Sequence, residues 1–192
     1  MKSVTRMDAE NDEINKKILV LGLDNSGKTS IVLSLKGDNN LMSYYSLRPT
    51  AGIDYNEIAD SNAKYFVWDL GGQAKYRDRH LEKIGDYLQG VSTVMYVIDV
   101  QDTERYGEVL QYLQEIADKI GDKLEFIRLV VYLHKYDPAI EMDVDNPLHQ
   151  EIQALTDKIY AIVPSAAVFK TSIYTIFRKI AVAAPPSRFS EP

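Results

Sequence analysis

Eight consecutive residues near the beginning of the chain have the composition of a phosphate-binding loop. Residues 22–29 read GLDNSGKT, which matches the Walker A pattern G-x-x-x-x-G-K-[ST]. Its glycines allow the chain to curl until backbone N–H groups converge on phosphate oxygens. The helix expected to follow would point its positive end at the same anion. The pattern therefore indicates a nucleoside phosphate site rather than an ordinary glycine turn.

Two side chains of this loop have predicted chemical roles. Lys28 is expected to reach the β- and γ-phosphates and to neutralise their charge during hydrolysis. The hydroxyl of Thr29 is expected to bind Mg²⁺. The predicted phosphate-binding residues are Asp24, Asn25, Ser26, Gly27, Lys28, Thr29, Ser30 and, later in the chain, Gly72.

A second segment, WDLGGQ, contains further groups that hydrolysis of a triphosphate needs. Asp69 can hold Mg²⁺ through water, and Gly72 can offer its N–H to the γ-phosphate. Gln73 is the predicted catalytic residue, together with Lys28, because its amide can orient the attacking water. Thr50 lies in a proline-containing loop and can complete the Mg²⁺ shell only when a γ-phosphate is present. That loop is therefore predicted to be a switch, ordered by triphosphate and released on hydrolysis. The predicted metal ligands are Thr29, Thr50 and Asp69.

A carboxylate after a later strand can distinguish guanine from adenine. The segment LHKYD ends in Asp137, which can accept hydrogen bonds from guanine N1–H and the 2-amino group. Adenine lacks that pair of donors, and an unpaired buried carboxylate is costly. The stem of Lys135 is expected to pack over the base plane, and backbone amides of residues 169–173 are expected to face guanine O6. The predicted guanine-binding residues are His134, Lys135, Asp137, Ser172 and Ile173.

These segments lie at the ends of alternating strands and helices. Apolar runs predict strands at residues 18–21, 53–59, 64–70, 91–100, 126–133 and 166–169. Apolar residues at helical spacing predict helices at residues 29–36, 103–119, 146–160 and 173–183, with a mixed helical stretch ending near Gln89 and a loop over 37–50. The predicted fold class is α/β: a P-loop NTPase with a mostly parallel six-stranded sheet and helices on both faces. In such sheets ligands bind beyond the carboxyl ends of the strands.

The composition excludes several functions. The chain has 192 residues, 22 Lys and Arg, 28 Asp and Glu, a net charge of −6 and no cysteine. The acidic balance argues against a nucleic-acid binder, and the lack of cysteine excludes disulfides, thiolate zinc sites and cysteine-linked lipids. No apolar run reaches the roughly 18 residues of a membrane span, and the first residues do not resemble a signal peptide. We therefore expect a cytoplasmic protein that reaches a membrane only through a partner.

One domain is expected over residues 16–184. A polar, flexible segment is expected before it at residues 1–15, and a short polar tail after it at residues 185–192. His80 and His149 are expected on helix surfaces.

Taken together, the segments resemble those of the Ras-like small GTPases, whose fold is the G domain. Within that group, GLDNSGKT, WDLGGQ and PTAG resemble the Arf family, in which isoleucine tends to stand in place of Ala51. The second half differs, because HKYD departs from the usual Asn-Lys-x-Asp and, with TSIY, resembles the Rag/Gtr family. The chain is therefore similar to an Arf/Rag-related small GTPase over roughly residues 16–184.

The resemblance implies a GTP/GDP molecular switch in trafficking or signalling that slowly hydrolyses GTP to GDP and phosphate, with Mg²⁺ as cofactor. It implies GTPase-activating proteins, nucleotide-exchange proteins and effectors as partners, and a second GTPase or a roadblock-type protein for a Rag-like branch. Lys2 stands where Arf proteins carry an acylated glycine, so membrane recruitment by that route is not expected. The loop after the predicted strand at residues 126–133, which contains Asp137, is called the base loop below. His134 in place of the usual asparagine is expected to remove an amide that ties the base loop to the P-loop. Arg48 is the only arginine expected near the switch.

Two other functions remain open. A non-hydrolysing GTP-binding scaffold is compatible with His134 and the unusual switch sequence, although Gln73 and Thr50 argue against it. A P-loop kinase or ATPase is disfavoured by Asp137 and by the lack of an arginine-rich lid. Nucleotide binding and phosphate release by the purified protein would separate the three functions.

Overall fold

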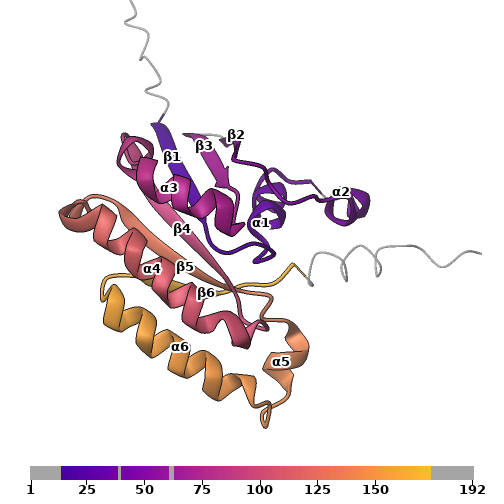
Figure 1. The fold of residues 1–192 in the computed structure, drawn as a ribbon. Helices are drawn as coiled ribbons and strands as arrows, with labels where there is room; N and C mark the ends of the chain where they lie inside the picture. Colours follow the sequence, from indigo (N-terminus) through magenta and orange to yellow (C-terminus); the bar gives the residue numbers. More distant parts are fainter. Residues whose placement is uncertain (1–13, 39, 61–62, 174–192) are drawn as a thin grey trace, which may run out of the picture.

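The computed structural model describes residues 14–38, 40–60 and 63–173, which form a six-stranded sheet flanked by helices (Figure 1). The strands stand in the order β2-β3-β1-β4-β5-β6. β2 pairs antiparallel with β3, and the other neighbouring pairs are parallel. The strands are β1 (Ile14–Leu21), β2 (Ile53–Asp60), β3 (Ala63–Leu70), β4 (Val91–Asp99), β5 (Arg128–His134) and β6 (Ala167–Lys170). The predicted α/β fold with a mostly parallel six-stranded sheet is confirmed.

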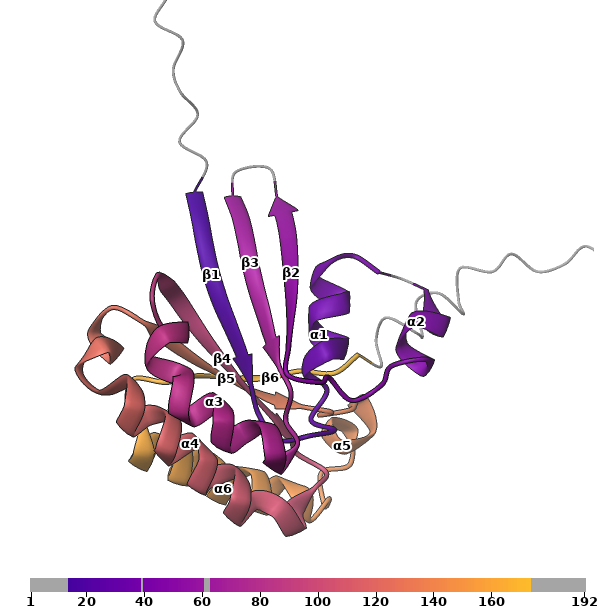
Figure 2. The ribbon, with the colours of Figure 1, turned by 45° about the horizontal axis from the view of Figure 1, so that its top comes forward.

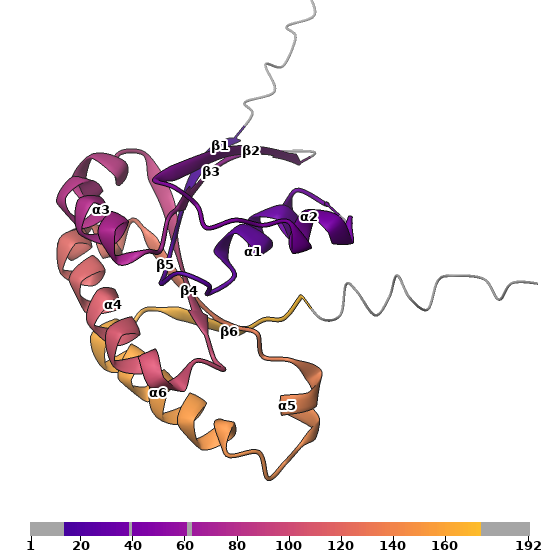
Figure 3. The same ribbon diagram turned by 45° about the vertical axis from the view of Figure 1, so that its right-hand side comes forward.

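Helices cover both faces of the sheet. Figure 3 shows α3, α4 and α6 on one face and α1 and α2 on the other. The helices are α1 (Lys28–Leu35), α2 (Leu41–Tyr45), α3 (Ala74–Tyr87), α4 (Tyr106–Ile120), α5 (Pro138–Met142) and α6 (Leu148–Ile162), and the 3₁₀ turns are η1 (Thr103–Arg105) and η2 (Gly121–Glu125). Within the described part of the chain, no helix is both long enough and apolar enough to cross a membrane.

Two clusters of buried side chains hold these layers together. The larger one joins strand residues such as Leu19 to the apolar stripes of α3, α4 and α6, including Ile116 and Ile159. The smaller one joins Val20 to Ile31 on the α1 face. Successive side chains of a strand point to opposite faces, so Leu19 and Val20 enter different clusters. A strand buried on both faces is therefore a continuous apolar run, which is the pattern that predicted it.

The structure differs from the predicted element boundaries in the first third of the chain. β1 begins at Ile14, because the end of the predicted lead-in pairs with β3. The predicted loop over residues 37–50 contains α2, and the side chain of its N-cap residue Asn40 accepts a hydrogen bond from the N–H of Met42. A helix of five residues is too short to carry a helical repeat, so the apolar pattern could not reveal it.

Two predicted segments lie mostly or wholly outside the described residues. These are the lead-in, described only from residue 14, and the last helix at residues 173–183, described only at Ile173. The tail at residues 185–192 is also outside them. The boundaries proposed for the single domain therefore stay predictions.

The loops that carry the candidate residues leave the sheet at one edge. β1, β3, β4, β5 and β6 run parallel, so their carboxyl ends share an edge. In Figure 2, β1 and β3 run side by side toward the loops that precede α1 and α3. The P-loop follows β1, the segment with Gln73 follows β3, and the segment with Asp137 follows β5. This topology brings together residues that are far apart in sequence.

Candidate functional site

The P-loop owes its shape to backbone conformations that glycine adopts readily. Gly22 has φ +143° and Gly27 has φ +91°. A Cβ atom on Gly22 would lie 2.3 Å from the carbonyl oxygen of Val97, and one on Gly27 would lie 2.4 Å from Cδ2 of His134. Both positions therefore require glycine for conformation and for space. Asn25 also has a positive φ, 58°, which asparagine tolerates better than most residues.

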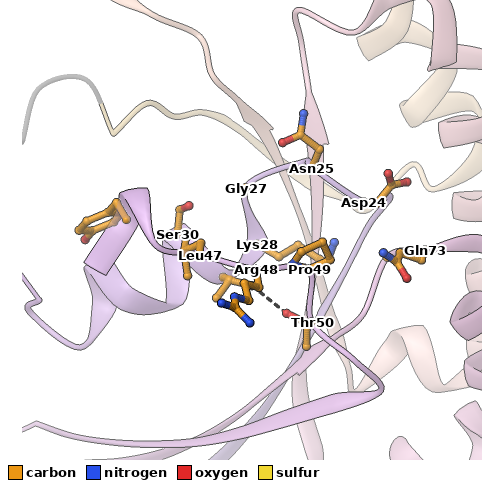
Figure 4. Close-up of a pocket in the computed structure, with 13 residues that line it drawn as sticks. Asp24, Asn25, Gly27, Lys28, Ser30, Leu47, Arg48, Pro49, Thr50 and Gln73 are labelled. Carbon is orange, nitrogen blue, oxygen red and sulfur yellow. Dashed lines mark hydrogen bonds between the residues drawn. The ribbon is translucent and has the colours of Figure 1, made fainter. Parts of the chain in front are cut away.

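The loop lines a pocket of about 360 Å³ (Figure 4). Three segments form its wall: the P-loop with the start of α1, the segment from α2 to Thr50, and the segment after β3. Seven of the eight predicted phosphate-binding residues line it, namely Asp24, Asn25, Gly27, Lys28, Thr29, Ser30 and Gly72. Ser26 is buried instead, and its hydroxyl donates to the carbonyl of Leu23 at 2.9 Å. No side chain caps the first turn of α1, so its N–H groups are available to an anion.

Lys28 is buried against the loop that precedes it. Its Nζ donates to the carbonyl of Leu23 at 2.6 Å. Burial lowers the pKa of Lys28 to about 8, although the carboxylates of Asp69 and Asp24 oppose this shift. The ammonium is therefore still largely charged at pH 7, and a phosphate beside it would favour that charge.

Three oxygen-bearing side chains converge next to Lys28. Thr29 Oγ1 lies 3.0 Å from Thr50 Oγ1 and 2.5 Å from Asp69 Oδ2. Thr50 Oγ1 lies 3.3 Å from the same carboxylate oxygen. Asp69 is fully buried, which raises its pKa, and its Oδ1 has no hydrogen-bond partner among the described residues. An unpaired buried oxygen is costly, and Mg²⁺ takes hard oxygen ligands, so the predicted metal ligands lie together and fit this ion.

Gly72 and Gln73 connect β3 to α3 beside the P-loop. The carbonyl of Gly72 accepts a hydrogen bond from the N–H of Asp24 at 3.0 Å. A Cβ atom on Gly72 would lie 2.3 Å from the carbonyl carbon of Leu23, so only glycine permits this approach of the two loops. Gln73 is the N-cap residue of α3 and lines the pocket. Gln73 therefore lies at the wall of the pocket, on the segment that contacts the P-loop.

Asp137 is held by side chains from two neighbouring loops. Ser172 Oγ donates to its Oδ1 at 2.5 Å, and Gln101 Nε2 donates to its Oδ2 at 3.0 Å. Ile173, the last described residue, follows Ser172 and is half-buried. The predicted guanine-binding carboxylate and the segment after β6 are therefore brought together at the carboxyl edge.

His134 links the base loop to the P-loop by packing. It is 3% exposed, its ring faces Gly27, and its Nδ1 lies 3.0 Å from the hydroxyl of Thr171. Burial lowers the pKa of His134 to about 4, so the ring is neutral at pH 7. His134 has no side-chain amide, as its residue type implies, but its ring keeps the two loops in contact. The neighbouring Lys135 has φ +60°, and its Nζ donates to Asp99 Oδ2 at 2.6 Å.

The sequence analysis did not single out two arginines near the site. One contacts the P-loop, and the other lies in α3, the helix that follows Gln73. Arg105 in η1 donates to a carboxylate oxygen of Asp24 at 3.0 Å and to its carbonyl at 3.2 Å. Arg77 in α3 donates to the carboxylate of Glu108 in α4. Arg48 lines the pocket, but the expectation that it is the only arginine near the switch is wrong. The position of Arg105, just after β4 at the carboxyl edge, was a usable signal; nothing local pairs Arg77 with Glu108.

His80 is buried, contrary to its expected place on a helix surface. It is 2% exposed, and its ring centroid lies 6.5 Å from that of Tyr76 and 6.0 Å from that of Tyr87. Burial lowers the pKa of His80. His149 is half-buried, and its Nδ1 lies 3.4 Å from the hydroxyl of Tyr136. The imidazole of His80 is therefore a packing residue, whereas His149 remains partly exposed on α6.

Known proteins match the chain over most of its length. The family model described as ADP-ribosylation factor family matches residues 1–183. ADP-ribosylation factor J from Dictyostelium discoideum is 29% identical over 168 residues, which cover 86% of this chain and 83% of that protein. ADP-ribosylation factor 3 from Arabidopsis thaliana is 31% identical over 153 residues, which cover 79% of each.

A solved structure has the same fold. The Arl6 (BBS3) small GTPase from Trypanosoma brucei, solved with the bound nucleotide analogue GppNp, matches with a TM-score of 0.61 and 18% identity. The match covers 88% of this chain and 96% of that chain. At this identity the likeness concerns the fold alone.

Proposed function

The chain belongs to the ADP-ribosylation factor family of small GTPases, and on that premise we propose that it is a GTP/GDP switch with slow, Mg²⁺-dependent GTP hydrolysis. One observation carries the proposal: Thr29, Thr50 and Asp69 meet beside the buried ammonium of Lys28, in a pocket that Gln73 also lines. These groups come from three separate segments. Each has the chemistry that phosphoryl transfer to water requires.

The proposed hydrolysis depends on position and charge. The P-loop amides and Lys28 hold the β- and γ-phosphates and stabilise the charge that develops on them. Thr29, Thr50 and, through water, Asp69 would hold Mg²⁺, which would supply further neutralisation of that charge. Gln73 orients the attacking water in line with the γ-phosphate.

The switch is proposed to act through Thr50. Its hydroxyl lies among the metal ligands, and the segment that precedes it lines the same pocket. The next segment is tied to β3, because the N–H of Gly71 donates to the carbonyl of Gly52 at 2.8 Å. Loss of the γ-phosphate would therefore release Thr50 and alter the contact between the two segments.

A cluster of aromatic side chains supports binding of an effector near the switch. Tyr55 in β2 is 63% exposed, and its ring centroid lies 4.9 Å from that of Trp68 in β3. Trp68 lies 5.9 Å from the ring of Tyr87, at the end of α3. β2 follows the proposed switch loop with Thr50, and α3 follows the segment after β3 that contacts this loop, so a change in either segment would change this aromatic surface.

Intrinsic hydrolysis is proposed to be slow because two of the three described arginines near the site are paired with carboxylates, and only the third, Arg48, lines the phosphate pocket. Arg105 is paired with Asp24 and Asp102, and Arg77 is paired with Glu108. An arginine that stabilises the transition state accelerates hydrolysis by roughly 10³–10⁵. We propose that a GTPase-activating partner supplies this acceleration and that a separate partner promotes nucleotide exchange.

The cellular setting is also a proposal. The net charge of −6 opposes direct adsorption to an anionic membrane surface, which favours the cytoplasm with membrane contact through a partner. The Rag-like segments HKYD and TSIY favour a second GTPase or a roadblock-type protein as that partner. A role in trafficking or signalling follows from the family.

Single-turnover hydrolysis in the Gln73→Leu variant tests the function. We expect GTP binding to be unchanged and phosphate release to slow by at least about tenfold, because leucine cannot orient water. Gln153→Leu is the matched control, since Gln153 lies exposed on α6, where its Nε2 donates to Asp157 Oδ1 at 2.9 Å. Equal rates in wild type and Gln73→Leu would remove Gln73 from the mechanism. A wild type that binds GTP and releases no phosphate would instead be the non-hydrolysing scaffold.

A further inference from the structure

We propose that Gln101 is a positioning residue for guanine selectivity: its side-chain amide holds the carboxylate of Asp137 in the orientation that accepts the base. The inference rests on the proposed function, because it assumes that Asp137 binds guanine. Gln101 lies just after β4 at the carboxyl edge of the sheet, and its side chain is exposed.

Gln101 uses both hydrogens of its amide nitrogen on the base loop. Nε2 lies 2.8 Å from the carbonyl oxygen of Lys135 and 3.0 Å from Oδ2 of Asp137. A carbonyl and an ionised carboxylate only accept hydrogen bonds. The amide must therefore present its nitrogen to both of them, which gives the contact a single orientation.

The backbone of Gln101 is fixed to the same loop through Asp99. The N–H of Gln101 donates to Asp99 Oδ1 at 3.0 Å, and Lys135 Nζ donates to Asp99 Oδ2 at 2.6 Å. The Asp99 carboxylate, at the end of β4, thus binds both Gln101 and Lys135. Gln101 positions Asp137, and Lys135 belongs to the same loop as Asp137. Gln101 is consequently a rigid support rather than a free surface side chain.

The carboxylate of Asp137 makes its hydrogen bonds outside the helix that follows it, α5. It is the N-cap residue of α5 but makes no side-chain cap, although aspartate is a favoured capping residue. Its Oδ1 accepts from Ser172 and its Oδ2 accepts from Gln101. An ionised carboxylate has about four acceptor positions, so one position on each oxygen remains for the adjacent N1–H and 2-amino donors of guanine.

Loss of the support from Gln101 should affect guanine and hypoxanthine differently. A carboxylate that is free to rotate must be ordered when the base binds, and that ordering weakens binding. Guanine loses two contacts when the carboxylate is misplaced, whereas hypoxanthine, which has N1–H but no 2-amino group, loses one. Loss of Gln101 should therefore weaken guanine binding more than hypoxanthine binding.

Calorimetry of the full chain with GDP, inosine diphosphate (IDP) and ADP tests the proposal. We expect wild type to prefer GDP over IDP, and Gln101→Ala to weaken GDP binding about tenfold and IDP binding less. Gln101→Glu should weaken GDP binding further, because it sets a second carboxylate against Asp137. Gln111→Ala is the matched control: Gln111 is also an exposed glutamine whose Nε2 bonds to a carboxylate, that of Glu115 at 3.0 Å, and all its affinities should equal wild type.

Two results would overturn the proposal while leaving guanine binding in place. One is Gln101→Ala binding all three nucleotides like Gln111→Ala. The other is a loss of the same factor for GDP and IDP, which would indicate a general structural role. A wild type that binds GDP no more tightly than ADP would contradict the proposed function itself, and this inference with it.

Discussion

Burial prepares Lys28 and Asp69 for charged ligands of opposite sign. It lowers the pKa of Lys28 to about 8 and raises the pKa of Asp69. Each shift favours the neutral form, and each would be reversed by the ligand proposed for that residue: an anion beside Lys28 and a cation beside Asp69. The site is therefore expected to exchange protons with solvent when it binds nucleotide.

Nucleotide binding should take up a proton at mildly alkaline pH. Free Lys28 loses its proton as the pH rises through about 8, while bound phosphates raise its pKa and keep it charged. Affinity for GDP should therefore stay level below about pH 8 and fall above it. Calorimetry at about pH 8.5 in two buffers of different ionisation enthalpy measures the uptake. Lys28→Arg, whose guanidinium stays charged, should show none; equal uptake by both proteins would contradict the assignment to Lys28.

Among single residues, the sequence predicts those that belong to a short local motif. Lys28, Thr29 and Asp69 are recognisable because each belongs to a short motif at the end of a strand. Gln101 and Arg105 are not, because their partners Asp137 and Asp24 lie 36 and 81 positions away in the chain. Pairings of that kind depend on strand order and register, which no local pattern contains.

At the scale of elements, the start of α1 and the end of β5 meet at one contact. Gly27 is the N-cap residue of α1, and His134 is the last residue of β5. Gly27→Ala would place a Cβ atom 2.4 Å from Cδ2 of His134, at a backbone φ of +91°. Both the clash and the backbone strain oppose the substitution.

We predict that Gly27→Ala lowers the free energy of unfolding by about 2 kcal/mol or more. Gly85→Ala is the control, since a Cβ atom on Gly85 meets nothing within 4 Å and alanine favours its helix, α3. It should raise that free energy by up to about 1 kcal/mol. Urea unfolding measures both, and His134→Ala should recover part of the loss in Gly27→Ala. Equal unfolding free energies of Gly27→Ala and Gly85→Ala would contradict the predicted clash between a Cβ atom at position 27 and the ring of His134.

The length of an element decides whether the sequence predicts it. Long buried strands and amphipathic helices, such as β4 and α4, follow from apolar spacing. α2 and α5 have five residues each, and they depend on a capping asparagine and an initiating proline rather than on a repeat. Their positions matter, because α2 precedes the segment that ends in Thr50 and α5 directly follows its N-cap residue, Asp137.

At the scale of the whole molecule, the two faces of the described sheet are covered unequally. α3, α4 and α6 cover one face (Figure 3). The α1 face carries a groove of about 620 Å³. Apolar residues that line the groove include Ile18, Leu35, Val67, Met95 and Val130. The domain is predicted to continue to residue 184, and the predicted helix at 173–183 supplies apolar residues that could cover this face.

A pair of truncated chains tests that boundary. A chain that ends at residue 184 should unfold at the same urea concentration as the full chain. One that ends at residue 173 should lose about 2–5 kcal/mol of unfolding free energy, because the apolar groove stays exposed to water. Urea unfolding followed by circular dichroism measures both. Equal stability of the three chains would place the end of the domain before residue 174.

The switch itself is tested most directly by a single-turnover measurement on the wild-type chain with Mg²⁺, in which bound nucleotide and released phosphate are followed in the same sample. We predict that one GTP binds per chain in the presence of excess ATP. It should be converted to bound GDP slowly, at a rate on the order of 10⁻⁴–10⁻³ s⁻¹, and Lys28→Ala should retain no GTP. Failure of the wild type to bind GTP, or equal retention by Lys28→Ala, would contradict the proposed site.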